Sequence, residues 1–258
     1  MRLTIIGCSG SFPGPESPAS SYLLEAEGFR LLLDLGNGAL GVLQRHTGLD
    51  EIDAICLSHL HADHCLDLTS YWVARRYAPG GPMPRLPVYA PARAAERMTL
   101  AYGLEPDPGP GIADMFPVTT LTPGTRQIGP FQVTAERMAH PVETYGFRIE
   151  HGGRVLAYSA DTGPCENLGA LARRADLLLC EATFLDGPNL PPGLHLTGRQ
   201  AGEAAEQAGA RHLVLTHIAP GTDKQRTFEE AREVFTGTLS LASSGQIFEL
   251  APAGPLPL

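Results

Sequence analysis

The sequence reads ICLSHLHADH from Ile55 to His64, placing three histidines and one aspartate directly after an apolar segment. If the chain stays extended through His59 and His61, both imidazoles point to the same side and can reach one metal ion. Asp63 and His64 then lie at the turn into a following helix and can face a second ion. Histidine nitrogen with some carboxylate oxygen is the ligand set of Zn²⁺, with Mn²⁺ or Fe²⁺ as alternatives. A histidine-rich surface loop is the competing interpretation, and the apolar residues around the cluster disfavour it.

Three more candidate ligands, His140, Asp161 and His217, each follow a predicted strand. In α/β proteins, strand ends at one edge of a sheet assemble sites from distant parts of the sequence. We therefore expect these three side chains to join the histidine-rich segment.

Hydrophobic periodicity and the placement of glycine and proline predict many short strands, followed by helices alternating with buried strands. Strands are expected at 2–7, 21–25, 29–35, 53–58, 88–90, 118–121, 131–138, 145–150, 155–159, 176–180, 212–216 and 246–250. Helices are expected at 37–46, 66–77, 92–102, 168–173, 198–208 and 228–235. No linker composition divides the chain, so residues 1–250 are predicted to form one domain and residues 251–258 a frayed tail. The proline-rich loops 79–87 and 105–117 could line a pocket, form a subunit interface or simply connect elements.

The composition narrows the classes of partner. The 258 residues carry a formal net charge of −9, which argues against non-specific binding to nucleic acid or to an anionic membrane. No stretch approaches the roughly 18 apolar residues of a membrane span. Five cysteines without a C-x-x-C motif, and no apolar run of signal-peptide length near Met1, fit a reducing, cytoplasmic location. The basic pairs Arg75-Arg76 and Arg173-Arg174 are expected on helices, facing solvent.

On these residues the chain resembles the metallo-β-lactamase-fold hydrolases. Asp34 in the segment LDLG, the cluster at 59–64, His140, Asp161 and His217 occur in the order of that family. The resemblance implies an α/β fold, a four-layer αββα sandwich with a site for two divalent metal ions along one sheet edge. The ligand sets it implies are His59, His61 and His140 for the first ion, Asp63, His64 and His217 for the second, and Asp161 between them. Asp34 would orient ligands without binding metal, or would be an ordinary strand-end turn aspartate.

Two further residues narrow the resemblance to the branch of ribonuclease Z and phosphodiesterases. Glu181 lies in CEATF after a predicted strand, and His195 lies in LHLT at a predicted helix start. In that branch the histidine protonates the leaving oxygen and the glutamate steadies the histidine. An alkoxide leaves poorly at neutral pH, and a positioned imidazolium contributes roughly 10²–10⁴-fold. A histidine in a helix cap and a buried structural glutamate are the competing interpretation.

The implied reaction is phosphodiester hydrolysis. Two metals roughly 3.5–4 Å apart lower the pKa of a bridging water and clamp the attacking and leaving oxygens. A metal-bridging hydroxide would attack, Asp63 would accept or orient its proton, and His195 would act as general acid with Glu181 behind it. Hydrolysis of thioesters, lactones or β-lactams runs on the same fold but does not call for the Glu181–His195 pair.

The length of one connection indicates the size of the substrate. The tRNA-processing members of the branch insert a long arm between the motifs of His140 and Asp161, whereas here the two residues are only 21 positions apart. The segment Ser11–Ser21 also lacks basic residues. A small phosphodiester therefore suits the chain better than nucleic acid, and the chain is most similar to short atypical cyclic nucleotide phosphodiesterases, acting on 3′,5′ or 2′,3′ cyclic nucleotides. The alternatives are a ribonuclease Z-like tRNA 3′-end endonuclease and a catalytically idle metal-binding scaffold. The resemblance also implies a homodimer.

Overall fold

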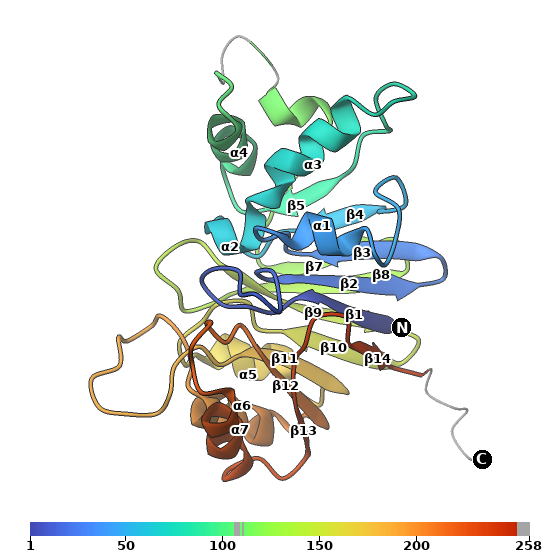
Figure 1. Ribbon diagram of the computed structural model, residues 1–258. Helices are drawn as coiled ribbons and strands as arrows, with labels where there is room; N and C mark the ends of the chain where they lie inside the picture. Colours follow the sequence, from blue (N-terminus) through green and yellow to red (C-terminus); the bar gives the residue numbers. More distant parts are fainter. Residues whose placement is uncertain (106–108, 110, 252–258) are drawn as a thin grey trace, which may run out of the picture.

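The computed structural model describes residues 1–105, 109 and 111–251, which form two seven-stranded sheets packed face to face (Figure 1). The first sheet has the order β14 (Ile247–Glu249), β1 (Arg2–Gly7), β2 (Ser21–Ala26), β3 (Phe29–Leu33), β4 (Ala54–Cys56), β5 (Val88–Ala90), β6 (Val118–Thr120). The second has the order β13 (Thr238–Leu241), β12 (His212–Thr216), β11 (Leu177–Glu181), β10 (Arg154–Tyr158), β9 (Tyr145–His151), β8 (Phe131–Arg137), β7 (Gly124–Ile128).

Helices cover the outer face of each sheet. Those on the side of the first sheet are α1 (Ala39–Leu43), α2 (Ala62–Cys65), α3 (Asp67–Arg76), α4 (Ala94–Tyr102) and the 3₁₀ helix η1 (Gly111–Asp114). Those on the side of the second are α5 (Glu166–Ala172), α6 (Gly198–Ala208) and α7 (Lys224–Arg232). The layers therefore run helix, sheet, sheet, helix, which confirms the predicted αββα sandwich. The predicted tail lies outside the described residues, apart from Ala251.

Three apolar layers hold these four structural layers together. Strand residues alternate between them: Leu31 and Leu33 pack between the sheets, whereas Leu32 faces the helices of the first sheet. In the second sheet Leu177 also lies between the sheets, and Leu178 packs against α5 to α7. Strands buried on both faces appear in the sequence as continuous apolar runs, which is why they could be located from the sequence.

The β2–β3 hairpin of the first sheet could also be predicted from the sequence. Strands β2 and β3 pair as Ala26 with Phe29, leaving a loop of Glu27 and Gly28. These two residues have φ angles of 50° and 79°. Two consecutive positive φ angles match the right-handed twist of the flanking strands, so the tight turn fixes the register.

The sequence missed two strands, β7 and β13, and placed one helix too late. Both missed strands lie at the edges of the second sheet, where half-exposed polar residues weaken the apolar pattern. Helix α7 begins at Lys224 rather than near residue 228, because the Asp223 side chain accepts a hydrogen bond from the Arg226 N–H and caps the helix.

The expectation that Arg75 faces solvent was wrong. Its side chain is buried at 2% exposure, and it donates hydrogen bonds to the carbonyls of Leu49 and Pro84 at 2.7 and 2.5 Å. A guanidinium can be buried in this way because several acceptors meet its fork of N–H donors. Arg75 thus ties the loop 79–87 to α3, and Arg85 joins that loop to the Ala113 carbonyl at 3.0 Å.

None of the helices in the described part of the chain combines the length and apolar character needed to span a membrane.

Candidate metal centre

The ends of parallel strands bring the candidate residues together. β3 and β4 are parallel neighbours in the first sheet, and β10, β11 and β12 are parallel neighbours in the second. The residues at or just beyond their carboxyl ends include Asp34 and His59 in the first sheet and Asp161, Glu181 and His217 in the second. Because the two sheets face each other, these ends form one site shared by both (Figure 1).

We call His59, His61, His140 and Asp161 the first ligand group; one ligand atom from each lies within 4.8 Å of all the others. The Nδ1 atom of His61 is 3.0 Å from His59 Nε2 and 3.2 Å from His140 Nε2. The extended backbone of His61, with φ −69° and ψ 150°, keeps its imidazole on the side of His59. The expected pairing of alternate residues is therefore what the geometry shows.

We call Asp63, His64, Asp161 and His217 the second ligand group, which meets the same 4.8 Å limit and is buried throughout. The Nε2 atoms of His64 and His217 are 3.1 Å apart, and His217 Nε2 is 3.1 Å from Asp63 Oδ2. Asp63 and His64 reach this position because the short helix α2 starts directly after His61.

Asp161 lies between the groups and turns one carboxylate oxygen to each. Oδ2 is 3.6 Å from His59 Nε2 and 3.9 Å from His140 Nε2. Oδ1 is 3.1 Å from His64 Nε2 and 3.4 Å from His217 Nε2. Asp161 Oδ1 is nevertheless buried without a hydrogen bond.

The donor set fits two divalent ions. Tetrahedral ligands about 2.0–2.1 Å from zinc lie about 3.3 Å from one another, close to the observed spacings of 3.0–3.2 Å between imidazole nitrogens. A buried carboxylate oxygen without a hydrogen bond also needs a cation or another partner. The convergence of imidazole nitrogens and carboxylate oxygens at this spacing therefore suits divalent metal ions.

Burial keeps the imidazoles of the first group in the neutral form. Desolvation lowers the pKa of His59, His61 and His140, with like-charge repulsion among the rings adding to it. A lowered pKa favours the neutral imidazole, which is the form that binds metal.

Carboxylates dominate the second group. Burial alone would lower the pKa of His64, but the charges of Asp161 and Asp34 outweigh it and raise the pKa well above its usual value. Burial likewise opposes ionisation of Asp63, yet hydrogen bonds from His217 and His64 hold its pKa below its usual range. The second group thus contains two carboxylates, whereas the first contains only the shared Asp161.

Asp34 supports the second group from behind. Its Oδ2 accepts hydrogen bonds from His64 Nδ1 at 2.7 Å, from the Tyr158 hydroxyl at 2.7 Å and from the Ser58 hydroxyl at 2.8 Å. A donor bond from Nδ1 fixes the ring so that Nε2 faces the ligand atoms. This geometry is compatible with the orienting role predicted for Asp34. Asp34 and His217 both have positive φ angles, 58° and 56°, so the backbone carries strain at the site.

Glu181 and His195 form the third cluster at the site. His195 Nδ1 donates to Glu181 Oε1 at 2.9 Å, and the same carboxylate accepts from the Thr162 N–H at 2.7 Å. Burial lowers the pKa of His195, but the hydrogen bond and charge of Glu181 outweigh it and raise that pKa. His195 Nδ1 also lies 4.0 Å from Asp161 Oδ2, so the pair borders both ligand groups.

Three hydroxyl groups at the site carried no signal in the sequence. Ser58 and Tyr158 bond Asp34, and the Thr183 hydroxyl lies 2.8 Å from His217 Nδ1 and 2.9 Å from Glu181 Oε2. Thr183 thus connects Glu181, which holds His195, to His217 of the second ligand group. Nothing in a single sequence separates these hydroxyls from others in strands, except that each lies within three residues of a candidate ligand or of Glu181.

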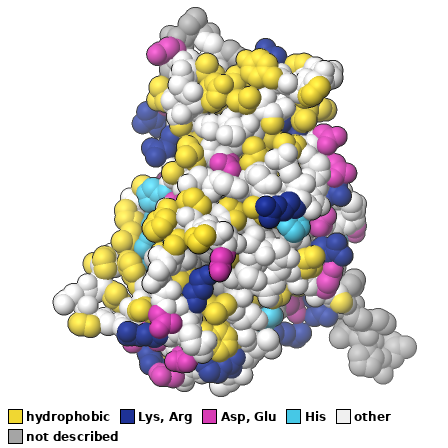
Figure 2. Space-filling model, viewed as in Figure 1, with side chains coloured by type: hydrophobic (Ala, Val, Ile, Leu, Met, Phe, Trp, Pro, Cys, Tyr) yellow, Lys and Arg dark blue, Asp and Glu magenta, His cyan; other side chains and the backbone are white. Residues whose placement is uncertain are grey.

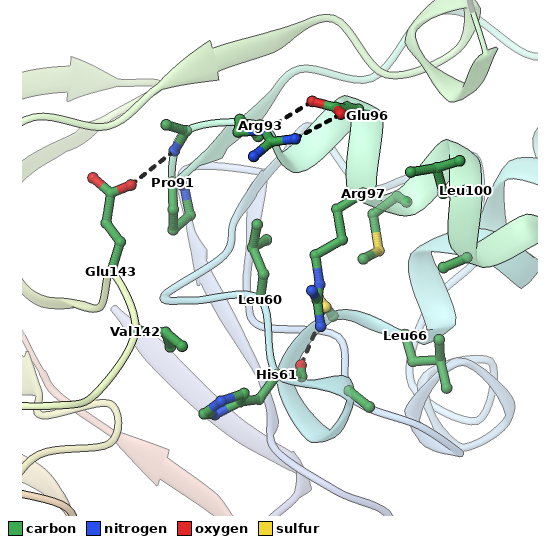
Figure 3. A pocket seen from close by; sticks show the side chains of 15 residues that line it. Leu60, His61, Leu66, Pro91, Arg93, Glu96, Arg97, Leu100, Val142 and Glu143 are labelled. Carbon is green, nitrogen blue, oxygen red and sulfur yellow. Dashed lines mark hydrogen bonds and ion pairs between the residues drawn. The ribbon is translucent and has the colours of Figure 1, made fainter. Parts of the chain in front are cut away.

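A cavity of about 740 Å³ opens beside the first ligand group, between α4 and the segment that carries His61 (Figure 3). We call it the α4 pocket; His61 belongs both to its lining and to the first ligand group. None of its lining residues comes from the described parts of the loops 79–87 and 105–117. The described residues of these loops therefore do not line this pocket. A subunit interface and a simple connection are the two roles left for them.

Comparisons with known proteins agree with this site. The profile of the β-lactamase superfamily domain matches residues 30–218. The protein ML1173 of Mycobacterium leprae is 44% identical over 97% of this chain and 89% of its own length. The ribonuclease Z of Halorubrum lacusprofundi is 30% identical over 97% of each chain.

A bacterial hydrolase provides both a sequence and a structural match. The probable metallo-hydrolase YhfI of Bacillus subtilis is 32% identical over 96% of this chain and all of its own. Its crystal structure superposes with a TM-score of 0.84, at 28% identity, over 96% of this chain and 98% of that one. The chain therefore belongs to the β-lactamase superfamily, as a metal-dependent hydrolase of the metallo-β-lactamase fold in the branch that includes ribonuclease Z and phosphodiesterases.

Proposed function

We propose that this protein hydrolyses a small phosphodiester, a 3′,5′ or 2′,3′ cyclic nucleotide. The observation that carries the proposal is the Glu181–His195 pair, with its 2.9 Å hydrogen bond, at the edge of both ligand groups. Hydrolysis of a diester of ordinary alcohols needs a proton for the leaving oxygen, and a raised His195 pKa keeps that proton available near neutral pH.

The proposed roles divide between the ligand groups and the residues around them. The ligand groups would hold two divalent ions, which supply an activated water and stabilise charge on the phosphoryl oxygens. Asp63, whose side chain is 10% exposed, accepts the proton of the attacking water. His195 donates the proton that the leaving oxygen takes as the P–O bond breaks. Glu181 holds His195 Nδ1, so that Nε2 is the nitrogen that faces the substrate.

The scale of the site supports a small substrate. The connection between His140 and Asp161 is a short hairpin of β9 and β10, and no arm extends from it. The α4 pocket, at about 740 Å³, falls in the size range of sites for small ligands. The net charge of −9 would steer a large polyanion poorly.

Zinc is the metal we propose. Five histidines and two aspartates make up the ligand groups, and imidazole with carboxylate suits zinc, with manganese or iron as the alternatives. One structure of similar fold, with a TM-score of 0.72 and 21% identity, is a Zn²⁺-bound PqqB from Methylobacterium extorquens.

We also propose a homodimer and a cytoplasmic location. The five cysteines are all free thiols, four of them buried, which fits a reducing compartment. Sedimentation equilibrium would test the dimer, and fractionation of the native host would test the location.

A ribonuclease Z-like endonuclease is the second candidate, because curated relatives of that name are 30% and 31% identical to this chain. An activity screen of the metal-loaded protein separates the two candidates by comparing cyclic nucleotides with precursor tRNA. We expect nucleoside monophosphate from at least one cyclic class and no tRNA cleavage. Cleavage of precursor tRNA without release from either cyclic class would overturn our choice.

The idle-scaffold alternative and the mechanism share one test. We expect hydrolysis of bis(p-nitrophenyl) phosphate by the metal-loaded protein and its loss in Asp63→Ala. Absence of any hydrolysis in the wild type would favour the scaffold, and persistence in Asp63→Ala would contradict the role given to Asp63.

A further inference from the structure

The α4 pocket continues the proposed active site. It shares His61 with the first ligand group, so a ligand whose phosphate lies at the metal centre would extend directly into it. Figure 3 shows the pocket bounded by α4 on one side and by the segment from Leu60 to Leu66 on the other. The pocket is therefore placed to receive the part of a substrate that lies beyond the scissile phosphate.

Most of the lining is apolar. The large apolar side chains that line it are Leu60, Leu66, Pro91, Met98, Leu100 and Val142. Leu100 and Val142 are 53% and 37% exposed, so their apolar side chains are open to a ligand in the pocket. Apolar side chains of this kind can pack against the faces of an aromatic ring, such as a nucleobase.

The charged groups of the lining differ in how far they are already paired. Arg93 makes two hydrogen bonds to Glu96, at 2.9 and 2.8 Å. Glu143 accepts from the Tyr145 hydroxyl at 2.8 Å and pairs with Arg137 at 2.9 Å, outside the pocket. These three pocket charges therefore have protein partners.

Arg97 differs from them. Its side chain extends from α4 across the pocket toward the segment of His61 (Figure 3). Within residues 1–105, 109 and 111–251 its guanidinium has neither a hydrogen bond nor an ion pair, whereas Arg93 one turn earlier has both. The dashed line that ends at the His61 carbonyl in Figure 3 marks the hydrogen bond from Cys65 Sγ, at 3.1 Å. A guanidinium offers five N–H donors and no acceptor, so its fork needs a pair of adjacent acceptors on the ligand.

Of the two purine bases, guanine presents such a pair. Its O6 and N7 atoms are both acceptors, and a bidentate arginine is their commonest specific partner. Adenine places an amino donor beside N7, so it does not offer two adjacent acceptors at that edge. We propose that the α4 pocket binds the base of the nucleotide substrate and that Arg97 selects guanine; this rests on the proposed phosphodiesterase function for the position of the phosphate.

Equilibrium binding of product nucleotides tests the pocket without catalysis. We expect the metal-loaded protein to bind guanosine 5′-monophosphate about tenfold more tightly than adenosine 5′-monophosphate. Arg97→Gln and Arg97→Lys should both bring that ratio near one, because lysine keeps the charge but lacks the fork. Arg45→Gln is the matched control: Arg45 is also exposed, follows α1 and does not line the pocket, so this variant should keep the ratio.

Kinetics supply the second measurement. In Arg97→Gln we expect KM for a cyclic guanosine nucleotide to rise about tenfold with kcat nearly unchanged, and KM for the adenosine counterpart to stay constant. A wild-type ratio near one, or a ratio unchanged in Arg97→Gln, would overturn the inference. A preference kept in Arg97→Lys would also overturn it, because charge alone would then explain the binding. Wild-type hydrolysis of bis(p-nitrophenyl) phosphate, which has no base, reports separately on the proposed function.

Discussion

The two ligand groups share Asp161 but differ in what holds them. In the first group His61 is half-buried, whereas the side chain of His140 is only 1% exposed and its Nδ1 donates to the backbone carbonyl of Leu194. In the second group every member is buried, and His64 and His217 are backed by Asp34 and Thr183.

Because of this difference, we expect the first and second ligand groups to have different roles. The second group contains two carboxylates, is buried and is held by side chains from both sheets, so it is the preorganised half. The first group adjoins the α4 pocket through His61, so it is the half that borders the cavity. We therefore expect substitutions in the two ligand groups to have different effects on metal binding and on catalysis.

Asp161→Asn should give the largest effect, because it replaces the carboxylate common to both groups with a neutral amide. We expect metal content to fall from about two ions per chain to less than one, with loss of bis(p-nitrophenyl) phosphate hydrolysis. Elemental analysis after gel filtration measures the metal. Asp176→Asn, which changes a carboxylate paired with Arg154 instead, is the control and should keep both ions. Full metal content in Asp161→Asn would contradict the bridging position.

His195→Gln should leave both ligand groups intact and act on the leaving group alone. We expect a loss of roughly 10²–10⁴-fold with a cyclic nucleotide, whose leaving oxygen needs a proton. With bis(p-nitrophenyl) phosphate the loss should be much smaller, because nitrophenolate departs without one. His151→Gln, in the hairpin between β9 and β10, is the control. Equal losses on both substrates would rule out a general acid.

Removing the metal should lower thermal stability, because the ions join ligands from both sheets. At a metal concentration of 100 times Kd the stabilisation is about 2.7 kcal/mol, which corresponds to roughly 5–10 °C in Tm for a chain of this length. Scanning calorimetry with and without a chelator measures it. Asp161→Asn should show almost no chelator effect, and an unchanged wild-type Tm would mean that the groups do not hold metal.

Asp34→Asn should produce the smallest of these changes and should separate the halves most sharply. We expect metal affinity at the second group to fall about 10–100-fold, with the first group little affected. Tyr158→Phe removes only one bond to Asp34 and should have a smaller effect of the same kind. A two-step metal titration resolves the sites, and equal weakening of both would contradict the comparison.

Much of the fold could be predicted because its strands are buried on both faces. Runs such as Leu31–Leu33 and Leu177–Leu179 have no polar residue to interrupt them, and Glu27-Gly28 specified the hairpin. The edge strands β7 and β13 were missed because one side of each lacks a neighbouring strand, so polar residues are tolerated there. Arg75 was misplaced because its acceptors, the Leu49 and Pro84 carbonyls, lie in loops that no local pattern connects to α3.

The residues of the site also divide into those that the sequence could predict and those that it could not. The cluster at 59–64 is compact in the sequence, and His140, Asp161 and His217 follow recognisable strands, so they could be proposed as partners. Tyr158 could not, because its bond to Asp34 spans 124 residues and forms only when the two sheets pack together. The α4 pocket was missed for a related reason: the position of Arg97 relative to His61 depends on how α4 packs, which no short-range pattern encodes.

The pairing of β14 with β1 has a consequence for the order in which the protein can assemble during synthesis. Arg2 pairs with Glu249, and the backbones of Met1 and Leu250 bond one another at 2.8 Å. The first sheet therefore keeps an open edge at β1 until residues 247–249 have left the ribosome, although its other six strands are made within the first 120 residues. A nascent chain stalled just before β14 would expose that edge, and its β1 amides should exchange with solvent faster than those of the released protein.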